Sequence, residues 1–180
     1  MLERLAVQLA DFLNALQAIA PSNGPLPGEH NFFRGVSPMV YNAETRSSLD
    51  NLEAYIDVDR AVSLWKLAIR SKWNKKPVWV HGDFSAGNIH IKNDQLAGVI
   101  DFGDMAVGDP SCDLVIAWTF LKETSRDKFR SALQLDEDTW TRARGWALWK
   151  ALITLEALED KASLKAQEQV AIIKDVIENF

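Results

Sequence analysis

Residues 78–113 read VWVHGDFSAGNIHIKNDQLAGVIDFGDMAVGDPSCD, and this stretch decides the predicted fold. It begins with an apolar run at 78–80 that is β-branched and aromatic enough for a short buried strand. Two further β-like runs, 89–91 and 96–100, flank the tetrapeptide KNDQ at 92–95, whose Asn and Asp tolerate the left-handed conformation of a tight turn. The stretch therefore predicts a β-hairpin with polar side chains at its strand ends.

Three of these polar side chains, Asp83, Asn88 and Asp101, have a spacing that suits phosphoryl transfer. Mg²⁺ prefers hard oxygen ligands and keeps several waters, so one or two carboxylates with phosphate oxygens are enough to hold it. A separate carboxylate must orient the attacking hydroxyl and accept its proton. In the kinase template these parts come from an Asp, an Asn five residues later and an Asp-Phe-Gly. We therefore predict Asp83 as the catalytic base, and Asn88 and Asp101 as Mg²⁺ ligands.

Each motif alone also has a purely structural interpretation. An isolated Asp-Phe-Gly is more often a turn than a metal site, and His-Gly-Asp alone is compatible with a strand exit. Seven residue types at fixed spacing, in a strand-loop-strand context, favour the functional interpretation because each fixed position makes a chance match rarer.

The combined pattern resembles the aminoglycoside phosphotransferase family, which includes choline kinase and macrolide kinase branches and is similar in fold to protein kinases. The matching residues are His81-Gly82-Asp83 with Asn88, Ile100-Asp101-Phe102-Gly103, and Gly108-Asp109-Pro110 followed by Asp113-Leu114. The resemblance implies transfer of a phosphate from ATP or GTP to a hydroxyl of a small molecule such as an aminoglycoside, and hence an antibiotic-resistance activity.

Several neighbours of these residues are expected to complete the site. His81 is placed in the catalytic centre beside Asp83, with the family implying that it fixes the catalytic loop through a backbone hydrogen bond. Asp104, three residues after the metal-binding Asp, is a candidate contact for a substrate ammonium group. Structural support is expected from Gly82, Phe102, Gly103, Asp109 and Asp113.

Two of these supports have specific expectations. Asp109 followed by Pro110 is a good N-cap signal for a helix through residues 115–120, so a cap is favoured over a metal ligand. Asp113 lies one turn into that helix, and the resemblance implies that it braces the catalytic loop from beneath.

Composition sets ordinary bounds: 180 residues give room for one domain or one lobe of a larger enzyme. The net charge of −5 argues against a nucleic-acid partner and mildly suits a cationic acceptor, although it is equally compatible with a role in solubility only. The single cysteine, Cys112, excludes an internal disulfide and fits a reducing cytoplasm. No signal peptide or membrane span is apparent, so we predict a cytoplasmic protein without a membrane partner.

The rest of the chain is predicted to be helical. Apolar residues at spacings of three and four indicate a first helix over 2–19, and further helices are expected between 30 and 73, over 139–158 as an amphipathic run, and over 163–179. Ser37, Asp57, Ser125 and Asp136 are predicted N-caps. The tryptophans of 139–158 are assigned to the core. Two interpretations stay open for several polar residues, which either line a substrate cleft or lie at interhelical or solvated positions: Arg34, Tyr41, Glu44 and Glu156.

A kinase-like enzyme also needs an N-terminal sheet with a phosphate-covering loop and a lysine. We therefore expect residues 1–180 to form an α+β, mainly helical C-terminal catalytic lobe of a protein-kinase-like fold, with the N-terminal nucleotide-binding lobe absent from this chain. Alone it should bind Mg-nucleotide weakly and turn it over slowly or not at all. Its first helix should leave apolar surface for an N-lobe partner or for self-association. The alternative is an inactive kinase-like lobe that serves as a binding or oligomerising module.

Overall fold

The computed structural model describes residues 1–178. Its helices are α1 (Leu2–Ala18), α2 (Asn42–Asn51), α3 (Val58–Arg70), α4 (Ile116–Thr119), α5 (Glu123–Leu133), α6 (Glu137–Ala157) and α7 (Leu164–Glu178), and its strands are β1 (Val78–Val80), β2 (Ile89–Lys92), β3 (Gln95–Val99) and β4 (Ala106–Gly108). Short 3-10 helices lie at Glu29–Asn31, Pro38–Tyr41, Ala86–Asn88, Phe102–Asp104 and Pro110–Val115. The predicted mainly helical α+β class is confirmed.

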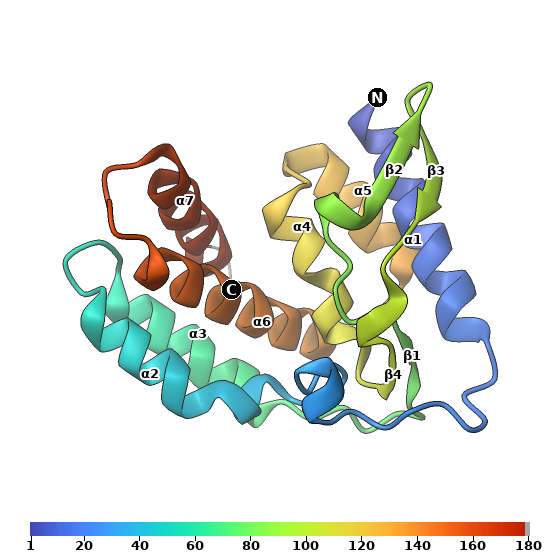
Figure 1. The fold of residues 1–180 in the computed structure, drawn as a ribbon, viewed down its shortest axis with the longest axis horizontal. Helices are drawn as coiled ribbons and strands as arrows, with labels where there is room; N and C mark the ends of the chain where they lie inside the picture. The colour runs from blue at the N-terminus through green and yellow to red at the C-terminus, as the bar shows by residue number, and fades with distance from the viewer. Residues whose placement is uncertain (179–180) are drawn as a thin grey trace.

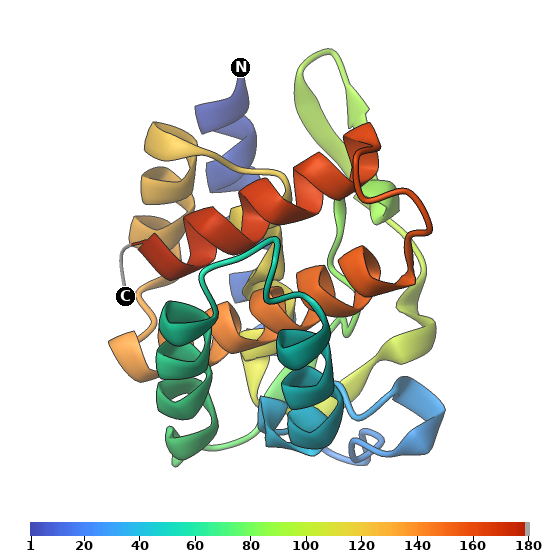
Figure 2. The same cartoon turned by 90° about the vertical axis from the view of Figure 1, so that its left-hand side faces the viewer.

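The elements form two groups on either side of α4 and the loops that follow β1 and β4 (Figure 1). Helices α2, α3, α6 and α7 make one group, and α1, α5 and the β2–β3 hairpin make the other. Figure 2 shows α7 running alongside α6, above it in this view, with the hairpin rising by the N-terminal end of α7. The loop between β1 and β2 thus lies between the hairpin group and the helical group.

The four strands form two separate antiparallel pairs. β2 pairs with β3 across a two-residue turn, and Asn93 and Asp94 in this turn have φ values of 52° and 60°. The left-handed conformation at both central positions is the geometry of the commonest tight hairpin. The second pair, β1 with β4, joins Trp79 to Val107 and was not predicted, because β4 is only three residues long.

Helix α6 lies at the centre of the helical group and is buried on most of its circumference. The sequence predicted an amphipathic helix, and this was wrong. It packs against α3, α7 and the 3-10 helix at Pro110–Val115, so it has almost no solvated face. At Gly145 a Cβ atom would lie 2.6 Å from the Cβ of Ala68, which explains how closely α3 approaches it.

Helix α1 begins as predicted and buries its apolar face against α5, β1 and β3. Its large exposed apolar residues are Val7 and Ile19, apart from the terminal Met1. The wide uncovered face expected for this helix is therefore mostly covered from within the chain, because α5 packs along it.

The predicted caps Ser37, Asp57 and Asp136 each accept a hydrogen bond from a backbone N–H of the first turn. The helix that Ser37 caps is a 3-10 turn, and the one that Asp109 caps is also 3-10 before it becomes α4. Ser125 was predicted wrongly: it lies inside α5, and its hydroxyl contacts the backbone of Lys122. The predicted end of the last helix, Asn179, lies outside the described residues.

None of the helices within residues 1–178 has the length and apolarity that crossing a bilayer requires.

Candidate active site

The hairpin places Asn88 next to the residues that follow β3. β2 begins directly after Asn88, and β3 ends at Val99. The Ile100 N–H donates to the Asn88 carbonyl at 3.0 Å, which closes the open end of the hairpin. The two predicted Mg²⁺ ligands, Asn88 and Asp101, therefore stand at the same end of one small sheet.

The Asn88 amide also holds Asp83. Its Nδ2 donates to the Asp83 carbonyl at 2.9 Å and to the Asp83 Oδ2 at 3.0 Å. The amide oxygen of Asn88 accepts no hydrogen bond among residues 1–178, so it remains available as a metal ligand.

Asp101 has an unusual backbone and a solvent-exposed side chain. Its φ and ψ of 63° and 66° are left-handed, a conformation that costs a non-glycine residue free energy and is concentrated at functional sites. Within the described residues its carboxylate makes no hydrogen bond or ion pair. A carboxylate held apart from protein partners in this way is free to bind a cation.

These donors fit a magnesium ion. Mg²⁺ takes oxygen ligands and keeps part of its shell for water and substrate phosphates. Asn88 and Asp101 offer one amide and one carboxylate oxygen on that pattern. Residues 1–178 contain no group of three or more His, Cys, Asp or Glu side chains arranged for a metal.

The loop that follows β1, residues 81–87, is the predicted catalytic loop, and it rests on Asp113. The buried carboxylate of Asp113 accepts hydrogen bonds from the His81 N–H at 2.7 Å and the Gly82 N–H at 2.8 Å. Burial raises the pKa of Asp113 to about 6, and the two N–H donors partly oppose that rise because they stabilise the charged form. Asp113 is thus a brace beneath the residues that precede Asp83.

The imidazole of His81 is buried, and both of its nitrogens are engaged. Nε2 lies 3.0 Å from the Ile100 carbonyl, and Nδ1 accepts from the Asp83 N–H at 3.3 Å. The ring also contacts Phe102, with 4.7 Å between ring centroids. No ring nitrogen is left to move a proton, so this geometry makes His81 a positioning residue that joins Asp83 to the chain just before Asp101.

Gly82 is required where the catalytic loop meets the Asp-Phe-Gly turn. Its φ is +88°, and a Cβ atom on it would lie 2.2 Å from the Asp104 carbonyl oxygen. Asn31, which sequence reasoning missed, donates from Nδ2 to that same oxygen at 3.2 Å. At Gly103, by contrast, the nearest atom to an added Cβ is an Asp101 carboxylate oxygen at 3.5 Å, so no close packing demands glycine there.

A buried ion pair fixes the segment after β4. Asp109 caps the 3-10 helix through the Ser111 N–H at 3.0 Å, and Arg142 of α6 contacts its Oδ2 at 2.6 Å. Arg142 further donates to Ser71 and Thr139, at 2.7 and 3.1 Å. Burial raises the pKa of Asp109, and the hydrogen bond from Arg142 opposes the rise. Sequence reasoning missed Arg142, although a cation among the tryptophans of a buried helix signals a buried partner.

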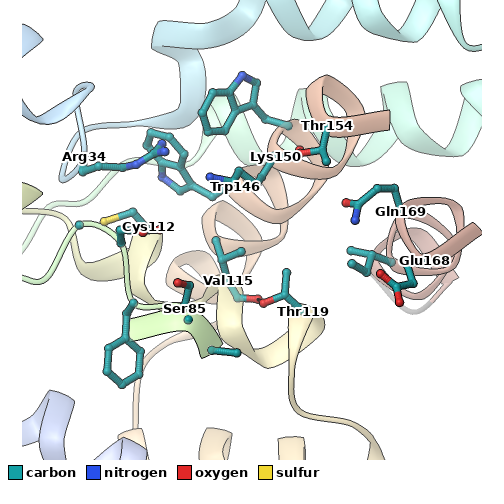
Figure 3. Close-up of a pocket in the computed structure, with 17 residues that line it drawn as sticks. Arg34, Ser85, Cys112, Val115, Thr119, Trp146, Lys150, Thr154, Glu168 and Gln169 are labelled. Carbon is teal, nitrogen blue, oxygen red and sulfur yellow. Dashed lines mark hydrogen bonds between the residues drawn. The ribbon is translucent and has the colours of Figure 1, made fainter. Parts of the chain in front are cut away.

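A cavity of about 390 Å³ opens beside Asp83 (Figure 3). Catalytic-loop residues 82–87 form one wall, and α4, α6 and α7 form the others. Arg34, Trp146 and Trp149 line it, so the two tryptophans assigned to the core also form a cavity wall. Lys150 and Gln169, which sequence reasoning did not select, line it as well.

Other candidates lie elsewhere. Asp104 is not among the residues that line this cavity, so its contact with a substrate stays a prediction. Glu156 accepts hydrogen bonds from Ser48 and Asn51 at 2.5 and 2.6 Å, which makes it an interhelical contact. Glu44 accepts the Trp149 Nε1–H at 2.6 Å and supports the cavity wall from behind.

The sequence matches the family model described as "Phosphotransferase enzyme family" over residues 2–146. No curated protein is similar enough in sequence to give a significant match.

Solved structures match the fold closely at low sequence identity. The GDP and kanamycin complex of APH(2'')-IIIa has a TM-score of 0.65 and 21% identity, covering 99% of this chain and 64% of that one. The streptomycin–ATP ternary complex of APH(2'')-IIa gives 0.53 and 20%, covering 96% and 62%, and macrolide 2'-phosphotransferase type I gives 0.59 and 18%, covering 97% and 59%. The chain thus spans less than two thirds of the length of each of these proteins.

Proposed function

The chain belongs to the phosphotransferase enzyme family, and from this premise we propose that it is the catalytic lobe of a small-molecule kinase, which moves the γ-phosphate of ATP or GTP to an acceptor hydroxyl. One observation carries the proposal. Asp83 lines a cavity large enough for a small molecule, and its carboxylate is hydrogen-bonded to Asn88, which stands at the same hairpin end as Asp101.

Asp83 is the proposed base. An acceptor in the cavity would bring its hydroxyl to the free carboxylate oxygen of Asp83, since Oδ2 is held by Asn88. The carboxylate would orient the hydroxyl and accept its proton as the oxygen attacks phosphorus. His81, through the Asp83 N–H, and Asp113, through the loop backbone, would keep the carboxylate in place.

Asn88 and Asp101 would hold Mg²⁺, which neutralises charge on the nucleotide phosphates when it is bound. The carboxylates of Asp83 and Asp101 repel a polyphosphate without it. Nucleotide affinity should therefore depend strongly on the metal.

A separate lobe is proposed to grip the nucleotide. The solved structures that bind GDP or ATP are longer than this chain, which covers 64% and 62% of them. Two apolar side chains beside the hairpin end, Ile100 and Phe102, and Ile91 on β2 are between 40 and 48% exposed. A nucleotide-binding lobe that packs on this side would cover them.

The proposed location of this kinase is the cytoplasm, because a chain with a single cysteine is suited to a reducing compartment.

The similar structures are complexes with kanamycin and streptomycin, which makes antibiotic inactivation the first activity to test. The test incubates the 180-residue chain with Mg-ATP or Mg-GTP and an acceptor panel of aminoglycosides, macrolides and simple alcohols. Mass spectrometry then detects the addition of one phosphate to the acceptor. We expect a slow reaction that Asp83→Asn abolishes, with calorimetric Mg-nucleotide binding that Asp101→Asn weakens.

Two outcomes would overturn the proposal. If the Asp83→Asn variant still forms product, Asp83 is not the catalytic base. Metal-dependent nucleotide binding without transfer to any acceptor, even after addition of a nucleotide-binding lobe taken from a structural neighbour, would favour a binding or oligomerising module instead.

A further inference from the structure

The cavity beside Asp83 has a charge distribution that the overall composition does not suggest. Its lining includes two positively charged residues, Arg34 and Lys150, and two negatively charged ones, Asp83 and Glu168. Asp83 is reserved for the acceptor hydroxyl in the proposed reaction. Figure 3 shows Arg34 and Lys150 toward the Trp146 end of the cavity and Glu168 at the opposite end, on α7. The Trp146 end therefore has two cations, and Glu168 lies away from them.

Three aromatic rings form a cluster at this end. Tyr41 stacks on Trp149 with 4.1 Å between ring centroids, and Trp149 meets Trp146 edge-on at 5.5 Å. Such clusters commonly bind organic cations over their π faces. In this protein the cation is supplied by the chain itself, since the Arg34 guanidinium lies 5.0 Å from the Trp146 ring centroid and 4.8 Å from that of Trp149.

Arg34 thereby blocks the position that a ligand ammonium group would take. Its own hydrogen-bonding groups remain unused, because within residues 1–178 its side chain makes no hydrogen bond or ion pair. A guanidinium has its N–H donors in its plane, so contact of its faces with indoles leaves the edge free to bind a carboxylate with two parallel bonds. Glu44 on α2 forms no ion pair with Arg34 and accepts a hydrogen bond from Trp149.

Lys150 adds a second cation to the same end. It is exposed on α6, lines the cavity and forms no ion pair within the described residues. The rest of the lining mixes apolar side chains, such as Val115 and Ile172, with uncharged polar ones, such as Thr119 and Gln169. The lining thus combines apolar surface with two cations that have no ion-pair partner among residues 1–178, and it includes the proposed base.

We propose that the acceptor is a hydroxylated organic acid with an apolar body, whose carboxylate binds Arg34 and Lys150 while its hydroxyl meets Asp83. This inference rests on the proposed function and narrows its substrate class. It runs against the cationic acceptor that the net charge of −5 favours, because the substrate would meet the cations Arg34 and Lys150 and not the average charge of the chain. Polycationic aminoglycosides would be repelled by Arg34 and Lys150 in this cavity.

The test measures binding without nucleotide, so that it does not depend on phosphoryl transfer. Three probes share one carbon skeleton and differ mainly in charge, namely phenyllactate, the neutral 3-phenylpropane-1,2-diol and the amine phenylalaninol, and kanamycin is added as a polycationic aminoglycoside. Titrations of the 180-residue chain are followed by NMR through the indole N–H signals of Trp146 and Trp149. We expect phenyllactate to bind roughly tenfold or more tightly than the diol, as a charge-assisted hydrogen bond implies, and the two amines to bind least.

Variants assign the effect to the two cations. Arg34→Gln and Lys150→Gln should each weaken phenyllactate binding about tenfold and leave diol binding within about twofold. Arg34→Lys should have an intermediate effect, because lysine keeps the positive charge but cannot form the two parallel hydrogen bonds of a guanidinium. Lys165→Gln, on α7 outside the cavity lining, is the matched control and should change nothing. Lys150 is on the surface, so its variant tests the proposal even where Arg34→Gln disturbs folding.

Equal binding of all four probes, absence of binding, or tighter binding of either amine would overturn the inference. So would a phenyllactate affinity that Lys150→Gln and Arg34→Gln leave unchanged. Selective binding of the acid without phosphate transfer to any acceptor would leave this inference standing and remove the proposed function. Transfer of phosphate to kanamycin, together with tighter binding of the amines than of phenyllactate, would support the proposed function and overturn this inference.

Discussion

The two sides of the catalytic loop differ in how their polar groups are satisfied. Beneath the loop, the carboxylates of Asp109 and Asp113 are buried and every oxygen meets a donor from Arg142 or the backbone. Above it, Asp101 is exposed in a left-handed conformation with no partner among the described residues. The buried side therefore contributes to stability, whereas the exposed side keeps charge and strain available for ligands.

The largest expected effect is on the buried side, at Arg142. Replacement by Met leaves the Asp109 charge without its partner, and breaking a buried pair in this way costs about 3–5 kcal/mol. We expect Arg142→Met to lower the free energy of unfolding by that amount in urea denaturation. The exposed Lys75–Asp136 pair, at 2.6 Å, is the control, and Lys75→Met should cost at most about 1 kcal/mol. Equal losses from the two variants would contradict the comparison.

The next effect is at Asp113. Asp113→Ala leaves the N–H groups of His81 and Gly82 buried without an acceptor, and each orphaned donor costs about 1–3 kcal/mol. The loss should appear both in urea denaturation and in faster hydrogen exchange of those two amides. Asp104→Ala, on the exposed turn, should change stability by about 0.5 kcal/mol or less, because its backbone carbonyl and not its carboxylate contacts Asn31.

The same comparison marks how far the sequence could predict the molecule. The hairpin, the spacing of Asp83, Asn88 and Asp101, and the caps at Asp57 and Asp136 are local patterns, and local patterns are visible in a sequence. The buried side depends on contacts between distant segments, such as Asp109 with Arg142. No periodicity encodes which carboxylate such an arginine will meet.

The cavity shows the same limit. Trp146 and Trp149 are core residues by their burial, as predicted, and yet the edge of that core is a cavity wall. Arg34 was left open between a cleft and an interhelical contact, because its position over two indoles is fixed only when α6 packs beside the loop. Lys150 looks like an ordinary surface lysine in the sequence, and only the placement of α7 makes it line a cavity.

A pH titration would sharpen the comparison through opposite shifts of two carboxyls. Burial raises the pKa of Asp113 to about 6, so the folded state holds the proton more tightly than the unfolded state, and the stability from this group is present below about pH 4 and lost as pH rises through 6. The hydrogen bond from Lys75 lowers the pKa of Asp136 to about 2, so its contribution is lost only as pH falls toward 2.

Carbon NMR of the two carboxyls is the direct measurement, with urea denaturation of wild type and Asp113→Asn between pH 4 and 7 beside it. The stability of wild type relative to this variant should fall across pH 4–6 and then level off. If the stability of wild type relative to Asp113→Asn instead rises between pH 4 and 6, the two backbone N–H donors lower the pKa of Asp113 by more than burial raises it.

The smallest effect on stability is expected at Asp101, where it should have the opposite sign. Glycine adopts the left-handed conformation without steric cost, so Asp101→Gly should stabilise the fold by at most about 1 kcal/mol or leave it unchanged. The same change should abolish metal-dependent nucleotide binding, because the exposed carboxylate is lost. Asp101→Asn separates the two causes: asparagine tolerates the same backbone, so stability should stay level while metal binding still falls. A destabilisation of about 2 kcal/mol or more by either variant, in urea denaturation without metal, would mean that Asp101 supports the fold like Asp113 and is not held ready for a ligand.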